Sequence, residues 1–317
     1  AQEHIHKGEA FGKLLCKCTY PSSSLEVHEP MHPDPRHGGG PQLGELGKMM
    51  PVTGVLFVVV VLYTQYVFLH GWRLLQFDLP DSSRQQDLVV QGYQQLGLFH
   101  IVTTLLLYSL ARCILTHPGH IPDGIGWELK AEPEEDTGGG LKELRSGFSE
   151  RKQTTGERRH CKWCLKYKPD RCHHCRICNT CILRMDHHCP WVYNCIGFRN
   201  HKYFFLVLVY GAIDLVFMNL TMFDSVWWAT RTDVSLAVMV MALGGACLAS
   251  SLMVLLVVFL GFHVWLMLQS MTTLEFCEKY LKKADYSSSV YSAGLYENTC
   301  AILGPRPLLW FVPVSFP

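Results

Sequence analysis

Charged residues are scarce in this chain of 317 residues, at 17% of the sequence, whereas apolar residues make up 49%. A typical soluble domain carries about 25% charged residues. The formal net charge is only +1, so the composition gives no general electrostatic argument for binding nucleic acid. An apolar run of the kind that forms a cleavable secretion signal is also missing from the first residues. Two features are abundant instead, namely long apolar runs and clustered cysteines.

Four apolar runs are long enough, or nearly so, to cross a bilayer as helices. They cover 52–69, 96–115, 203–223 and 234–268, and a membrane-spanning helix needs about 18–20 residues. A single run of this kind would also suit a buried helix of a soluble protein. Four nearly uncharged runs together predict an integral membrane protein. The fourth run exceeds one crossing, so a continuous helix that projects from the membrane is one interpretation of it.

The basic residues predict how these spans are oriented. The segment 116–202 holds fifteen Lys and Arg, whereas the loops 70–95 and 224–233 hold three between them. Both termini and the 116–202 segment are therefore expected on the cytosolic side. Thiols stay reduced in the cytosol, so a cysteine cluster in that segment is predicted to bind metal rather than to form disulfides.

These patterns divide the chain into six segments. The tail is rich in His, Pro, Gly and Ser, and the linker is charged and rich in glycine, as is typical of disordered chain. The predicted segments are a disordered cytosolic N-terminal tail (1–48), transmembrane helices 1 and 2 (49–115), a cytosolic linker (116–157), a cysteine-rich zinc-binding module (158–202), transmembrane helices 3 and 4 (203–268) and a cytosolic C-terminal segment (269–317).

Eight of the 14 cysteines fall between residues 161 and 195. Cys161 and Cys164 are separated by two residues, as are Cys175 and Cys178, and this spacing lets both sulfurs reach one tetrahedral ion. Two such pairs with further Cys and His predict two zinc ions, which would supply the folding energy of a segment with few apolar residues. Spacing alone leaves two options open. Two sites of four cysteines use every sulfur, and two sites of three cysteines and one histidine leave two cysteines over.

The stretch "KPDRCHHCRICNTCILRMDHHCPWVYNCIGFRNHKYF" resembles the cysteine-rich domain of the DHHC protein S-acyltransferases, or palmitoyltransferases. The resemblance extends to the four spans and to "TTLE" after the fourth span, which is similar to the family's TTxE motif, and covers roughly residues 50–310. The fold that it implies is an α-helical integral membrane protein. Four transmembrane helices would carry a small cytosolic two-zinc cysteine-rich module between helices 2 and 3.

The resemblance also implies two interleaved zinc sites of three cysteines and one histidine each. The first set is Cys161, Cys164, His174 and Cys181. The second set is Cys175, Cys178, His188 and Cys195. Of the two cysteines that remain, Cys172 matches a position that is not a ligand in the family and is expected only to pack, which leaves Cys189.

A free thiol becomes a good nucleophile when a neighbouring base takes its proton and a third group orients that base. Asp186, His187 and Cys189 supply these three kinds of group, in roles that resemble a hydrolase triad. Adjacent side chains diverge, so His188 can bind zinc while His187 serves as the base; without the resemblance, two ligands would be an equally good interpretation. Thr273, in "TTLE", is implied to lie close to Asp186 and to steady it.

The reaction that the resemblance implies is acyl transfer in two steps, from acyl-CoA (palmitoyl above all) to Cys189 and then to a protein cysteine. Its partners would be palmitoyl-CoA or a similar acyl-CoA, protein substrates with cytosolic cysteines and the lipid bilayer, and not nucleic acid; both zinc ions would be structural. A multi-pass protein of the endoplasmic reticulum, Golgi or plasma membrane fits this activity. The alternative is a catalytically silent membrane scaffold that uses its zinc module to hold partners.

Further residues receive weaker assignments. Trp191 and Phe204 resemble the family's acyl-contacting positions, although aromatic anchoring at the membrane interface accounts for them equally well. Asn298 resembles an Asn that packs near the module. Asp214 lies near the middle of the third span, where a carboxyl group is expensive; it could shorten the accepted acyl chain or pair with another helix, with His263 as a possible partner. Six basic residues could meet CoA phosphates, or form a solvated surface near anionic lipid. These are Arg158, Arg159, Lys162, Lys166, Lys168 and Arg171.

Overall fold

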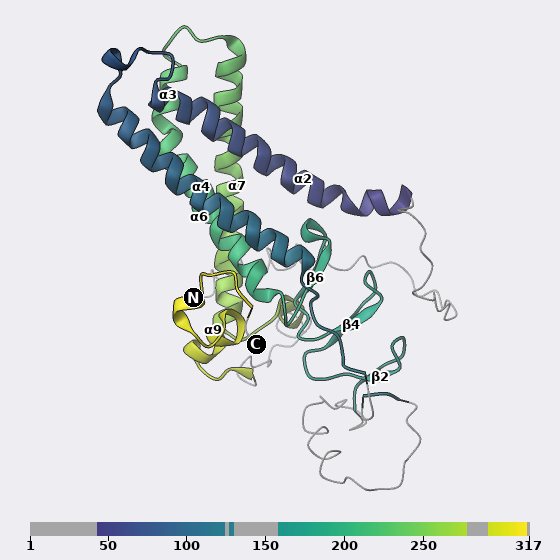
Figure 1. The fold of residues 1–317 in the computed structure, drawn as a ribbon. Helices are drawn as coiled ribbons and strands as arrows, with labels where there is room; N and C mark the ends of the chain where they lie inside the picture. Colours follow the sequence, from purple (N-terminus) through teal and green to yellow (C-terminus); the bar gives the residue numbers. More distant parts are fainter. Residues whose placement is uncertain (1–42, 124–126, 130–157, 278–290, 316–317) are drawn as a thin grey trace, which may run out of the picture. The chain divides into compact units, whose positions relative to one another are not determined.

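The computed structural model describes residues 43–123, 127–129, 158–277 and 291–315 (Figure 1). The predicted tail up to residue 42 and most of the predicted linker therefore lie outside the described residues. The chain divides into two compact units, which are taken in turn below. The helical unit comprises Met49–Ile114, Lys202–Trp265 and Leu303–Pro317, and the hairpin unit comprises Ala1–Lys48, Leu115–His201 and Leu266–Ile302.

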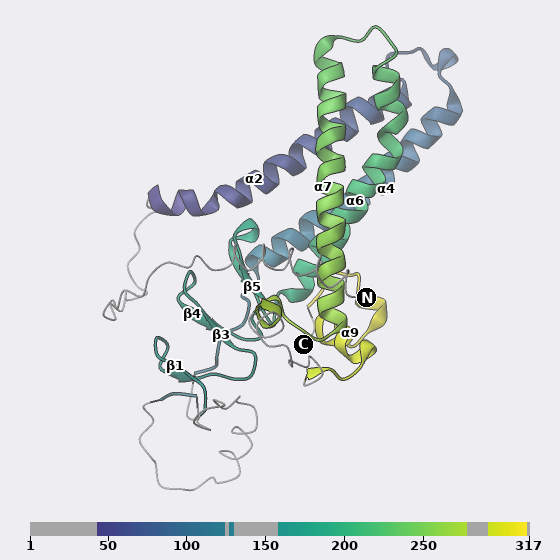
Figure 2. The same ribbon diagram turned by 180° about the vertical axis from the view of Figure 1, so that it is seen from behind.

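Four long helices form the helical unit (Figures 1 and 2). They are α2 (Leu43–Gln65), α4 (Gln86–Leu115), α6 (His201–Ala229) and α7 (Leu236–Leu268). Each contains a segment long and apolar enough to cross a membrane, so all four predicted spans are confirmed as helices. The first continues beyond α2 through a π-helical turn, η1 (Tyr66–Gly71), into α3 (Trp72–Leu75), and a 3-10 turn, η2 (Asp81–Ser83), precedes α4. The fourth apolar run is one unbroken helix of 33 residues.

The core of the helical unit gathers around Tyr66, whose ring is fully buried. Its centroid lies 4.1 Å from that of Phe99 in α4, and its hydroxyl group shares a hydrogen bond of 3.0 Å with Thr221 in α6. Ala249 of α7 belongs to the same cluster, so every long helix contributes to it. Large apolar side chains such as Leu220 remain exposed on the outside of the helices, which suits contact with lipid.

Asp214 is the buried carboxyl group of this unit. Its Oδ2 atom accepts a hydrogen bond of 3.0 Å from the hydroxyl group of Thr103 in α4. The carboxyl group therefore pairs with another helix, but the prediction of His263 as its partner is wrong. The ring of His263 lies against Phe204 and Phe259, with centroid distances of 5.0 and 4.6 Å. The carboxyl group thus links two spans, because an unpaired polar group inside a bilayer would cost several kcal/mol.

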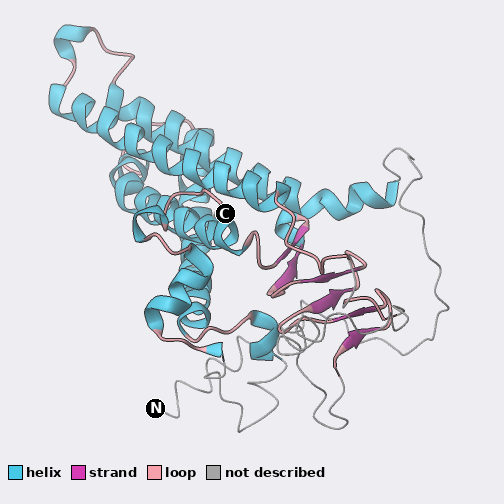
Figure 3. Ribbon diagram, turned by 60° about the horizontal axis from the view of Figure 1, so that its bottom comes forward, coloured by secondary structure: helices cyan, strands magenta, loops and turns pink. Residues whose placement is uncertain are grey.

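The described part of the hairpin unit contains three antiparallel hairpins of two strands each (Figure 3). They pair β1 (His160–Cys161) with β2 (Lys166–Tyr167), β3 (His173–Cys175) with β4 (Thr180–Ile182), and β5 (His187–Cys189) with β6 (Asn194–Ile196). A 3-10 turn, η3 (Pro190–Val192), joins the last pair. Strands this short bury little apolar surface, and five of the nine buried residues in the two small clusters of this unit are cysteines. The module therefore needs another source of stability, as zinc would provide.

Among the described residues, three short helices follow α7: α8 (Thr273–Glu275), α9 (Leu295–Leu303) and the 3-10 turn η6 (Pro307–Leu309). Two side chains hold α9 in the hairpin unit. Arg184, just before β5, donates a hydrogen bond of 2.7 Å to the carbonyl oxygen of Ala301 in the last turn of α9. Asn298 donates one of 2.8 Å to the carbonyl oxygen of Leu268, the last residue of α7. This second contact is with α7 and not with residues 158–202, so the position of Asn298 near the module stays a prediction.

Candidate active site and metal centres

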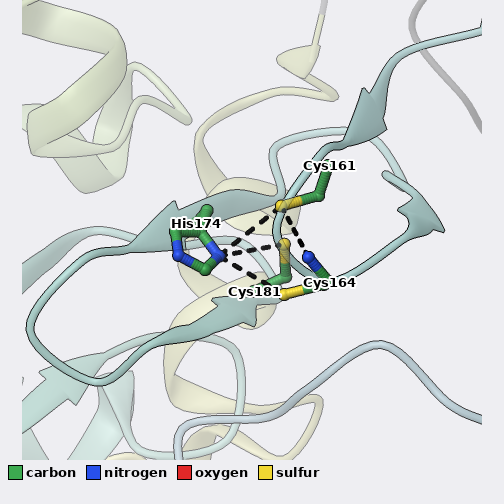
Figure 4. Close-up of side chains that lie close together, drawn as sticks. All are labelled: Cys161, Cys164, His174 and Cys181. Atoms are coloured by element: carbon green, nitrogen blue, oxygen red, sulfur yellow. Dashed lines mark hydrogen bonds between the residues drawn. The ribbon is translucent and has the colours of Figure 1, made fainter. Parts of the chain in front are cut away.

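The first set of metal donors lies where β3 and β4 face the turn between β1 and β2 (Figure 4). The Nδ1 atom of His174 is 3.5 Å from the sulfur of Cys161, 3.3 Å from that of Cys164 and 3.9 Å from that of Cys181. Tetrahedral zinc with Zn–S bonds of about 2.3 Å and Zn–N bonds of about 2.0 Å places such donors about 3.5 Å apart. The donor set and its spacing therefore fit a zinc ion.

The second set repeats this arrangement one hairpin later. The Nδ1 atom of His188 is 3.7, 3.4 and 3.5 Å from the sulfurs of Cys175, Cys178 and Cys195. The four donor atoms lie within 4.8 Å of one another, as they do in the first set. All the sulfurs of both sets are free thiols rather than disulfides. Of the two options that spacing left open, the geometry favours three cysteines and one histidine at each site.

The local backbone explains why the first two cysteines of each set point inward. The amide of Cys164 donates to the sulfur of Cys161 at 3.4 Å, and the amide of Cys178 donates to that of Cys175 at the same distance. Strand pairing then brings the other two ligands together, because His174 lies opposite Cys181 and His188 lies opposite Cys195. Each set therefore combines the turn of one hairpin with the paired strands of the next.

The three hairpins repeat every 14 residues, a period that our sequence analysis did not find. Three residues with left-handed backbone, Leu165, Asn179 and Tyr193, mark it at each turn, with φ of 49°, 49° and 47°. Cys189 in β5 then occupies the position of Cys175 in β3. Val192 occupies that of the ligand Cys178, so the third hairpin lacks the second sulfur of the pair.

Cys189 is a free thiol with 5% of its surface exposed, and His187 lies beside it. The imidazole shares a side-chain hydrogen bond with the Cys189 thiol. On its other side, His187 Nδ1 lies 2.6 Å from Oδ2 of Asp186. A carboxylate only accepts, so Nδ1 carries the proton of that bond and the other ring nitrogen is left for the thiol.

Thr273 in α8 fixes the carboxylate of Asp186. Its amide donates to Oδ1 at 2.9 Å, and its hydroxyl group donates to Oδ2 at 2.8 Å. The backbone of Asp186 is held as well, since its amide donates to the carbonyl oxygen of Ile196 and its own carbonyl oxygen accepts from Leu274. The predicted neighbourhood of Thr273 and Asp186 is thus present, and the carboxylate has a defined orientation toward His187.

The electrostatics of this group favour a protonated imidazole. Burial alone lowers the pKa of His187, but the hydrogen bonds to Asp186 and Cys189, with the negative charge of both partners, raise it to about 10. A raised pKa makes His187 a stronger proton acceptor than an ordinary imidazole. Asp186, His187 and Cys189 therefore form a connected acid, base and thiol that can transfer a proton from sulfur to nitrogen.

Comparison with known proteins assigns this arrangement to a family. The family described as DHHC palmitoyltransferase matches residues 154–280, which include every hairpin and α8. Palmitoyltransferase ZDHHC15A of Danio rerio is 32% identical over 278 residues, covering 84% of this chain and 80% of that protein. Probable protein S-acyltransferase 16 of Arabidopsis thaliana is 30% identical over 281 residues, covering 85% and 90%. The chain belongs to the DHHC palmitoyltransferase family.

The two aromatic residues that resemble the family's acyl contacts lie in different surroundings. Trp191 lies in η3, two residues after Cys189, and is 60% exposed. Phe204, the fourth residue of α6, is buried against His263 within the helical unit. A contact of either residue with an acyl chain stays a prediction.

One of the six basic residues predicted to contact CoA phosphates or to form a solvated surface, Arg171, does neither. Its side chain is only 11% exposed, and its guanidinium forms a two-point ion pair with Glu275 of α8. It is therefore neither a solvated surface group nor open to a phosphate. Arg158 lies 4.4 Å above the ring of Tyr167, and Lys166 is paired with Asp123. Glu275 was missed, although Thr272 and Glu275 have the spacing of a capping box, which is visible in the sequence.

Proposed function

We propose that the chain is a protein S-acyltransferase that moves a long-chain acyl group, palmitoyl above all, from acyl-CoA to protein cysteines through an S-acyl-Cys189 intermediate. The observation that carries the proposal is the free, buried thiol of Cys189 beside an imidazole that is itself held by a carboxylate. The names of the relatives, palmitoyltransferase and protein S-acyltransferase, support the same reaction.

The two steps follow from the groups present. His187 takes the proton of the Cys189 thiol, and the sulfur forms a bond to the thioester carbonyl carbon of acyl-CoA while the bond to the CoA sulfur breaks. The CoA thiolate leaves with the proton that His187 carries. A substrate cysteine then gives its proton to His187 and attacks the acyl group, and Cys189 leaves as a thiol with that proton. Each step exchanges one thioester for another, so the net free energy change is small.

The remaining residues would support this chemistry without taking part in bond making. Asp186 orients His187 and stabilises its charged form, and Thr273 orients Asp186. The eight ligands of the two sets would hold zinc, which would supply folding energy to the hairpins. Each site has four protein donors, so it is closed and leaves no position for a substrate.

The apolar helices supply the setting for a fatty acyl substrate. Four spans make the chain a multi-pass membrane protein, and the distribution of basic residues supports a cytosolic position for the module and both termini. The CoA head and the target cysteines would then be in the cytosol, and the acyl chain would lie among the helices. Trp191 and Phe204 remain our candidates for contact with it.

The test is to incubate the purified full-length chain with labelled palmitoyl-CoA. We expect a hydroxylamine-sensitive label on the unaltered chain and none on Cys189→Ser, with two zinc ions per chain in both. Cys300→Ser is the matched control, because Cys300 is a half-exposed free thiol in α9. The Cys300→Ser chain should keep the label of the unaltered chain. An unaltered chain that takes no label with any chain length would favour the scaffold. Loss of zinc from Cys189→Ser would contradict the ligand assignment.

A further inference from the structure

A buried ion pair joins the hairpin module to α8. Nε of Arg171 lies 2.7 Å from Oε1 of Glu275, and Nη2 lies 2.7 Å from Oε2. The side chains are 11% and 2% exposed, so both groups are largely removed from water. Two parallel hydrogen bonds of this kind fix the relative orientation of both planar groups, which a single contact would not do.

Glu275 is at the same time part of the cap of α8. Its Oε2 atom accepts from the amide of Thr272 at 2.9 Å, and its own amide donates to the hydroxyl group of Thr272 at 3.2 Å. This is a complete capping box around a helix of three residues. Thr273, which holds Asp186, is the first residue inside the box. The position of its two donors therefore depends on the side chain of Glu275.

Arg171 also holds the chain that leads into this box. Helix α7 ends in a turn with left-handed Ser270, in which the amide of Met271 donates to the carbonyl oxygen of Leu266. Nη2 of Arg171 donates to the carbonyl oxygen of Ser270 at 2.8 Å. One guanidinium thus binds the residues on both sides of Thr272 and Thr273, and fixes the turn from two directions.

The backbone of Arg171 is bonded to the segment before β5 that carries the acid. The amide of Met185, directly before Asp186, donates to the carbonyl oxygen of Arg171 at 3.1 Å. The same residue therefore contacts the segment that presents Asp186 and the segment that presents Thr273. Its left-handed backbone, with φ of 60°, directs the chain through this junction.

We propose that Arg171 and Glu275 are positioning residues for acyl transfer, which lock the two donors of Thr273 onto Asp186 and thereby hold His187 toward Cys189. This inference rests on the proposed function for its consequence, but its geometry is independent of the substrate. A buried ion pair adds little net stability over apolar side chains of similar size, because both charges lose their hydration. Its specific contribution is therefore the fixed geometry of the Thr272–Glu275 box.

The test replaces the pair by apolar side chains of similar length, Arg171→Met with Glu275→Met, so that no unpaired charge is left buried. Arg176→Met is the control, because Arg176 is an exposed arginine of the same module. We expect two zinc ions per chain in each protein. Self-acylation of the double variant should fall about 10-fold to 100-fold, as the loss of one hydrogen bond to a charged group implies. The control should keep the unaltered rate.

The second measurement is the pH dependence of Cys189 alkylation by iodoacetamide, in a background with Cys300→Ser. Poor placement of the base should move the half-maximal rate of the double variant to higher pH, and the control should not shift. An unchanged rate and profile with both zinc ions bound would overturn the proposal. So would loss of zinc from both the double variant and Glu275→Gln alone, which would make the pair a fold element only. If the unaltered chain took no acyl label, the proposed function would fail, whereas the alkylation profile would still test the positioning.

Discussion

The hairpins β3–β4 and β5–β6 have the same strand pairing, but the cysteine at the matching position has a different role in each. In both, a His-His-Cys strand pairs with a strand seven residues on, and the second histidine lies opposite a ligand cysteine. In the first, Cys175 is joined by Cys178 and completes a metal set. In the second, Cys189 is followed at the same distance by Val192, so its thiol has no sulfur partner for a metal site.

The comparison extends to the histidines before these cysteines. His173 and His187 occupy matching positions, as the first residues of β3 and β5. The residue before His187 is Asp186, whose carboxylate bonds to the imidazole, whereas the residue before His173 is Cys172. Two replacements in a metal-binding hairpin, Asp for Cys and Val for Cys, therefore accompany the change from ligand to candidate nucleophile. The metal sites next to it keep the same backbone in place.

The largest expected effect comes from removing a ligand at the position that matches Cys189. In Cys175→Ser the second site loses one of its four donors, and apparent zinc binding in such modules is worth about 10–16 kcal/mol of folding free energy. We expect zinc to fall from two ions to one per chain, with loss of acyl labelling. Metal analysis and thermal unfolding would measure this. Retention of both ions would break the distinction between the two hairpins.

The next largest effect is expected when the third hairpin is made to match the other two. Val192→Cys restores the pair of cysteines separated by two residues, and the thiol at 192 should reach Cys189 as Cys178 reaches Cys175. After treatment with oxidised glutathione, which accepts the two electrons, most acyl labelling should be lost to a disulfide between the two thiols, and dithiothreitol should restore it. Val192→Ala is the control, since it alters the buried side chain without adding sulfur. If labelling of Val192→Cys were the same with and without reductant, the turn of β5–β6 would differ in geometry from the turn of β3–β4.

A smaller effect is expected at the hydroxyl group of Thr273. Thr273→Val keeps the amide donor to Asp186 and removes the side-chain donor, so one of two hydrogen bonds to the carboxylate is lost. Such a bond to a charged group is worth about 1.5–3 kcal/mol, and we expect self-acylation to fall about 10-fold. Thr299→Val, which removes an exposed hydroxyl group of α9, should leave the rate unchanged. Equal rates in both variants would remove Thr273 from the catalytic group.

The sequence was sufficient for features that depend on neighbouring residues. The spans appear as long uncharged runs, and the two cysteine pairs by their separation. The helix limits were less well predicted: α4 begins at Gln86 rather than near 96, because polar first turns continue a helix without adding apolar character. The resemblance supplied the ligand sets and the neighbourhood of Thr273 and Asp186, and the geometry is consistent with both.

The features that were missed depend on contacts between distant residues. Arg171 and Glu275 are 104 positions apart, and neither charge indicates in the sequence that it is buried. Their pairing follows only from the turn after α7 and the backbone bond of Arg171 to Met185. The 14-residue period of the hairpins was present in the sequence. It was obscured because Val192 replaces a cysteine in the third copy, so the pattern of ligands no longer repeats there.

The smallest effect is expected in the helical unit, at Asp214. Asp214→Asn keeps an oxygen that can accept from Thr103 and removes the negative charge from the buried link between α4 and α6. If the hairpins perform the chemistry and the helices hold the acyl chain, zinc content and the pH profile of alkylation should not change. The preference between myristoyl-CoA and stearoyl-CoA should shift by about fourfold, the value of one buried methylene at ~0.8 kcal/mol. Thr103→Val, which leaves the carboxyl group without its donor, is the companion variant. A changed alkylation profile in either variant would show that Asp214 affects the reaction at Cys189 rather than only the binding of the acyl chain among the helices.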